Sequence, residues 1–71
     1  MHKINPSKLH HSKWTAAQPS RKEKHFIVTQ LLRDEKEKVV KVVIEAIYSH
    51  RERVVPWQNL KDDSVWKAGW Q

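Results

Sequence analysis

The sequence predicts a small, mainly β domain, an antiparallel sheet closing as a half-open, SH3-like barrel with a short C-terminal helical turn. The segments HFIVTQLL and VVKVVIEAIY are dense in β-branched and aromatic residues, which favour strands. A charged connection, RDEKEK, separates them, and because it lacks glycine it makes an imperfect hairpin turn. The 71 residues hold four tryptophans and no cysteine, so aromatic burial must stabilise a core that is small for its surface.

Taken from the N-terminus, residues 1–12 are expected to be a flexible basic arm, because they are polar and carry the turn signal Asn5-Pro6-Ser7. Residues 13–71 then form one domain. Strands are expected near residues 13–18, 25–33, 38–49 and 51–56. The last of them ends at Pro56, which has no N–H to donate to a ladder.

The centre of the chain admits a second interpretation, a helical hairpin over residues 20–50. Ser20 and Glu23 have the spacing of a capping box, and lysine and glutamate are abundant. The β-branched density favours strands instead. Strand alternation then turns Phe26 toward the core and His25 toward solvent.

The C-terminal segment WQNLKDDSVWKAGWQ predicts a short helical turn, a cap at residues 62–64 and a further turn. The spacing of Trp66 and Trp70 would place both on one side of that turn, as a lid over the core. Gly69, the only glycine, suits a positive φ where the helix stops. The expected core is therefore Trp14, Phe26, Val28, Val42, Ile44, Trp66 and Trp70.

Six spaced motifs, INPSKL, SKWTAAQP, EKHFIV, IEAIYSHRERVVPW, LKDDSVW and GWQ, cover nearly the whole chain. Together they resemble a small bacterial tryptophan-rich protein family of unknown function. The resemblance implies no activity. It implies a hairpin at DEKEK, where members of the family often carry glycine or other turn-forming residues, and so it favours the strand interpretation.

The sequence predicts neither an enzyme nor a cofactor or metal site. One glycine cannot build a phosphate-binding loop, and no serine lies in a nucleophile elbow. The five histidines lack helical metal-ligand spacing and have no thiolate to assist them. The first residues contain no apolar segment of the secretory type, and the most apolar run, VVKVVIEAIY, is too short to span a bilayer. A cytoplasmic protein without a membrane partner is expected.

The net charge of +6 comes from the N-terminal third, where residues 1–24 hold six Lys/Arg and one Glu. Such an excess favours a polyanionic partner, although it also fits a segment that only maintains solubility. We expect a monomeric, non-enzymatic module that binds single-stranded RNA or the ribosome. The alternative is a protein-interaction or assembly adaptor that uses the sheet face and Trp57. The candidate nucleic-acid contacts are Lys8, Lys13, Arg21, Lys22, Lys24, Arg53 and, for base stacking, Trp57.

Overall fold

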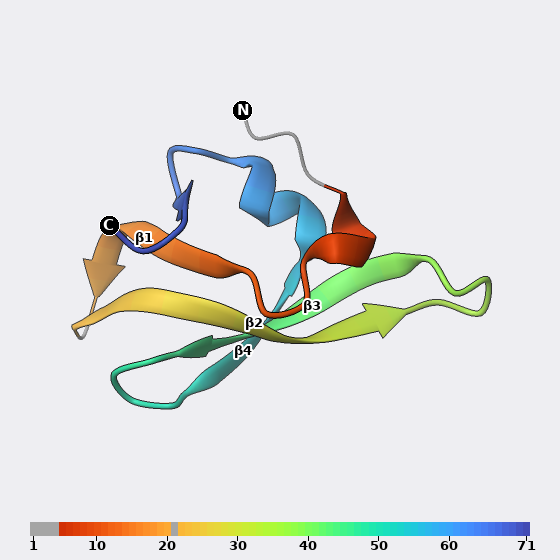
Figure 1. Cartoon of the computed structure of the whole chain (residues 1–71), viewed down its shortest axis with the longest axis horizontal. Helices are drawn as coiled ribbons and strands as arrows, with labels where there is room; N and C mark the ends of the chain where they lie inside the picture. Colours follow the sequence, from red (N-terminus) through yellow and green to blue (C-terminus); the bar gives the residue numbers. More distant parts are fainter. Residues whose placement is uncertain (1–4, 21) are drawn as a thin grey trace.

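A computed structural model describes residues 5–20 and 22–71, and these form a mainly β domain (Figure 1). The fold class predicted from the sequence is thus confirmed, and the helical hairpin over residues 20–50 is excluded. The elements are two 3₁₀ helices and five strands: η1 (Pro6–Lys8), β1 (Lys13–Ser20), β2 (Glu23–Arg33), β3 (Val39–Ala46), β4 (Glu52–Pro56), η2 (Trp57–Lys61) and β5 (Trp66–Ala68).

All five strands belong to one antiparallel sheet in the order β4-β3-β2-β1-β5. The first four strands follow one another as a meander, and β5 returns to pair with β1. The two edges are therefore β4 and β5, and the sheet is open. The finer expectation of an SH3-like barrel is not confirmed.

The β2–β3 hairpin turns without glycine. The Asp34 carboxylate Oδ1 accepts hydrogen bonds from the backbone N–H groups of Lys36 at 2.9 Å and Lys38 at 3.0 Å. Glu37 adopts a left-handed φ of 62°. An aspartate side chain thus replaces part of the backbone pairing that a glycine turn would supply.

Strand β3 ends three residues earlier than expected. Ala46 N donates to Arg51 O at 2.9 Å, and His50 N donates to Ala46 O at 2.8 Å. Residues 47–51 therefore form the β3–β4 turn, and His50 takes a positive φ of 60° within it.

The core lies on one face of the sheet, which we call the inner face. Six expected core side chains are buried there: Trp14, Phe26, Val28, Val42, Ile44 and Trp66. The Trp66 ring meets Phe26 edge-on with 5.0 Å between ring centroids. Helix η2 covers this face and contributes the fully buried Leu60, and η1 lies beside η2 on the same side (Figure 1).

The expected arm over residues 1–12 needs correction, because its described part belongs to the folded unit. Leu9 is buried in the core. His11 N donates to Val28 O at 2.8 Å and Val28 N donates to Ser12 O at 2.9 Å, so this segment lies against β2. The buried Leu9 side chain, these two backbone bonds and a contact of 3.1 Å between His10 Nε2 and Thr29 O hold it. Residues 1–4 of the expected arm lie outside the described residues.

The C-terminal segment departs from the sequence prediction in its second half. The first helical turn is present as η2, but Trp66–Ala68 form strand β5. Gly69 has the expected positive φ, 78°, at the end of a strand and not of a helix. The chain crosses there to the other, outer face of the sheet. The expectation that Trp70 belongs to the core is therefore wrong: Trp70 is 44% exposed, whereas Trp66 is 4% exposed.

Candidate functional site

An aromatic and basic cluster lies on the outer face of the sheet, around Trp70. The Lys13 ammonium Nζ lies 4.8 Å from the centroid of the indole ring, a cation–π distance. The His25 ring lies 5.9 Å from it, tilted by 41°. Two further exposed lysines stand beside the neighbouring Gln71, so the Trp70 cluster comprises Lys13, Lys24, His25, Lys67 and Trp70.

Strand alternation explains why Lys13, His25 and Lys67 share a face. Lys13 and Thr15 flank the inward-facing Trp14, and in the β1–β2 ladder Thr15 is paired with His25. Thr15 is also paired with Lys67 of β5. Paired residues point to the same side of a sheet, so three neighbouring strands contribute to one surface.

Thr15 fixes the segment that carries Trp70. Among the residues that the structure describes, Thr15 is the one polar residue that is buried, at 3% exposure. Its hydroxyl Oγ1 donates to Gly69 O at 2.7 Å and accepts from Gln71 N at 3.0 Å. The hydroxyl thus donates one hydrogen bond and accepts another, one on each side of Trp70.

The indole itself is also held. Its Nε1 donates to Phe26 O of β2 at 2.9 Å. The His25 imidazole Nε2 lies at hydrogen-bonding distance, 2.9 Å, from Gln71 O. The exposed aromatic ring is therefore presented on a rigid sheet and needs little ordering when a ligand binds.

A shallow pocket of about 350 Å³ adjoins the cluster. Lys24 and Lys67 are its cations, and Thr15 and Gln71 form part of its wall. Its two lysines suit a phosphate group.

The structure separates the nucleic-acid contacts expected from the sequence. Lys13 and Lys24 belong to the Trp70 cluster, and Lys22 is exposed in the β1–β2 turn. Lys8 lies in η1. Arg21 lies outside the described residues.

The two remaining candidates, Arg53 and Trp57, do not join the cluster. The Arg53 guanidinium lies over the inner-face Phe26 ring, 5.4 Å from its centroid. Each of the two tryptophans has a lysine ammonium 4.8 Å from its ring centroid, Lys61 at Trp57 and Lys13 at Trp70, but Trp57 is half-buried against the core whereas Trp70 is 44% exposed. The pockets that Arg53 and Trp57 line share no residue. Of the two rings, Trp70 therefore offers the larger exposed surface.

Sequence reasoning turned His25 toward solvent but missed Trp70 and Lys67 as its neighbours on that surface. The i,i+4 spacing of the two C-terminal tryptophans suggested a shared helical face. The useful signal was Gly69, because a positive φ directly after a three-residue strand redirects the next side chain.

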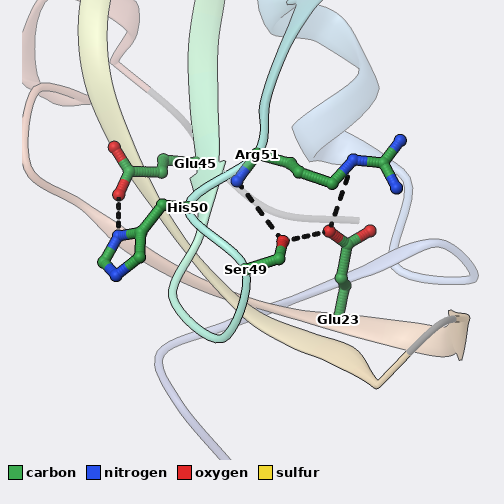
Figure 2. Close-up of polar contacts among 5 residues, drawn as sticks. All are labelled: Glu23, Glu45, Ser49, His50 and Arg51. Carbon is green, nitrogen blue, oxygen red and sulfur yellow. Dashed lines mark hydrogen bonds and ion pairs between the residues drawn. The ribbon is translucent and has the colours of Figure 1, made fainter.

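The β3–β4 turn places a serine and a histidine next to each other, but not as a nucleophile and its base. The Ser49 hydroxyl donates to Glu23, whereas His50 Nδ1 lies 2.8 Å from the Glu45 carboxylate on the other side of the turn (Figure 2). A hydroxyl nucleophile needs the base within hydrogen-bond reach of its own oxygen. These two side chains bind different carboxylates, so the pair serves the turn.

Within the part of the chain that the structure describes, no group of three or more candidate ligands could hold a metal ion. In the same residues, no helix has the length and apolar character needed to cross a membrane.

Fold and surface together define a small open-sheet β domain with one exposed aromatic and basic cluster. The family described as "Tryptophan-rich protein (DUF2389)", whose function is unknown, matches residues 12–71, and the chain belongs to that family. Neither a curated protein nor a solved structure matches the chain.

Proposed function

We propose that this chain is a non-enzymatic module that binds single-stranded nucleic acid, RNA in the first place, through the Trp70 cluster. One observation supports the proposal most: an indole that is 44% exposed has the Lys13 ammonium 4.8 Å from its ring centroid, and Lys24 and Lys67 line a pocket with the neighbouring Gln71. Proteins that bind single strands without sequence preference combine an aromatic ring for stacking with cations along the backbone.

The proposed interaction is weak and tolerant of sequence. Every base can stack on an aromatic ring, and stacking on one side chain contributes about 1–3 kcal/mol. Three lysines neutralise up to three phosphates, which at about −0.7 per contact gives a log–log salt slope of about −2. The module acts as a monomer in the cytoplasm in this proposal, with cellular RNA, ribosomal RNA included, as its partner.

A salt titration tests the proposal. A fluorescently labelled single-stranded RNA is titrated with the protein from about 50 mM salt upward, and the slope is compared between two double variants. Lys13→Gln with Lys67→Gln should reduce the magnitude of the slope by about 1.4, which is two contacts at about 0.7 each. Lys36→Gln with Lys38→Gln, two exposed positions of the β2–β3 hairpin, is the matched control and should leave the slope unchanged.

Two results would refute the proposal. One is the absence of binding at micromolar protein in low salt. The other is an equal loss of slope in the hairpin control, which would show a diffuse attraction of the whole basic chain and not a site.

A further inference from the structure

A second surface, independent of the Trp70 cluster, lies where the sheet stays open. A pocket of about 390 Å³ on the inner face joins strand β4 to β1 and to the turn before β5. Its floor is aromatic, formed by Phe26 and Trp66. The remaining lining residues are Ala16, Gln18, Glu23, Arg53, Ser64 and Val65.

The two charged residues of this pocket differ in how they are paired. The Glu23 carboxylate accepts a hydrogen bond from the Ser49 hydroxyl, and the Arg51 Nε lies 3.8 Å from it (Figure 2). Among the described residues, no ion pair engages the Arg53 guanidinium, which lies only over the Phe26 ring. The uncompensated charge of the pocket is therefore positive, and a guanidinium suits a carboxylate in a two-point contact.

The strand that carries Arg53 has a free edge. Ala46 N donates to Arg51 O at 2.9 Å, and the ladder pairs Ile44 with Arg53. Hydrogen-bonded pairs alternate along an antiparallel ladder, so the backbone groups of Arg53 face β3. Those of Glu52 and Val54 then face away from the sheet. An edge of this kind accepts a further strand.

From the free edge and the unpaired guanidinium together, we propose that β4 binds an extended acidic segment of a partner protein by strand addition. The segment pairs with the outward-facing backbone groups of Glu52 and Val54, and one of its carboxylates enters the pocket and meets Arg53. In this mode the backbone bonds supply affinity and the pocket selects the side chain. Gln18 and Ser64 supply neutral polar groups at its rim.

The proposal separates protein binding from nucleic-acid binding in space. Arg53 points to the inner face, whereas Lys13 and Trp70 occupy the outer face. A substitution at the Trp70 cluster should therefore leave peptide binding at β4 unchanged, and a substitution at Arg53 should leave RNA binding unchanged. The two proposals can thus fail independently.

The test uses capped ten-residue peptides in which valine alternates with glutamate, glutamine or lysine, titrated into ¹⁵N-labelled protein. The valine–glutamate peptide should shift the amide signals of Glu52, Arg53 and Val54, and the other two peptides should bind at least about tenfold more weakly. Arg53→Gln should weaken the glutamate peptide about tenfold. Arg33→Gln, another exposed strand arginine, is the matched control and should not.

A second variant addresses the strand addition itself. Val54→Pro removes a backbone N–H of β4 that faces solvent, and an edge strand tolerates such a change, so the fold should persist. The bound peptide then loses the hydrogen bond that this N–H would donate to it. Circular dichroism checks the fold, and binding of the glutamate peptide should fall.

Three outcomes would overturn the proposal. The first is no binding at millimolar peptide. The second is equal binding of the glutamine peptide, which would remove the role of Arg53. The third is a single-stranded RNA that shifts the Arg53 signal while the peptide does not, which would assign the pocket to a phosphate.

Discussion

Trp66 and Trp70 lie four residues apart, and the structure predicts very different costs for removing them. Trp66 is 4% exposed and meets Phe26 edge-on in the core. Trp70 is 44% exposed on the outer face and is held by one indole hydrogen bond. Trp66→Ala and Trp70→Ala therefore form a matched pair of perturbations that differ mainly in burial.

The expected magnitudes follow from the exposed fractions. A buried tryptophan truncated to alanine costs about 3–5 kcal/mol in free energy of unfolding, because a cavity adds to the lost transfer energy. About half of the Trp70 side-chain surface of roughly 200 Å² is buried in the folded protein. At about 25 cal/mol/Å², and allowing for a compact denatured state, its truncation should cost about 1.5–2.5 kcal/mol.

Urea unfolding monitored by far-UV circular dichroism measures both values. A difference of about 2 kcal/mol corresponds to a Tm difference of roughly 8 °C or more in a domain of this size. If Trp66→Ala leaves no folded baseline, Trp66→Phe and Trp70→Phe give the same comparison. Equal losses, or a larger loss at Trp70, would refute the assignment of the two side chains to opposite faces.

Three further predictions concern other parts of the fold. Leu9→Ala should cost about 2–4 kcal/mol in urea unfolding, since Leu9 is 4% exposed, and a loss below about 0.5 kcal/mol would show that residues 5–12 are dispensable. Glu37→Gly should stabilise the protein by about 0.5 kcal/mol. Glycine relieves the strain of the left-handed φ of 62° in the folded state, and this gain exceeds the loss from the greater conformational entropy of glycine in the unfolded chain. A lower Tm for that variant would contradict this reasoning. Gly69→Ala should cost about 1–2 kcal/mol through its φ of 78° alone, because an added Cβ meets no atom within 4 Å, and an unchanged Tm would show that the backbone there relaxes freely.

The strands could be predicted from the sequence because their signal is local. β-branched residues are dense in β2 and β3, and the inward positions Phe26, Val28, Val42 and Ile44 follow simple alternation. Alternation fails after Val28, where the ladder shifts register, because an extra residue in one strand leaves no mark in composition.

Other features depend on distant parts of the chain and could not be predicted. Leu9 is one apolar residue in a polar stretch, and only its contact with the assembled core shows that residues 5–12 belong to the domain. The Trp70 cluster needs three strands in register, so neither Lys67 nor His25 could be assigned to it from spacing. Arg53 was singled out from the sequence as a binding candidate for its charge alone. Its pocket exists because β4 and β5 fail to close the sheet.

The indole N–H signals distinguish the proposed binding of single-stranded RNA at Trp70 from binding at Trp57. The chain has four tryptophans, so four indole signals are expected in a ¹⁵N-correlation spectrum and each can be assigned by single substitution. On titration with a short single-stranded RNA, the Trp70 indole and the amides around Lys13, His25 and Lys67 should shift, while the Trp57 indole should not. Shifts centred on Trp57, or none at saturating RNA, would contradict the account.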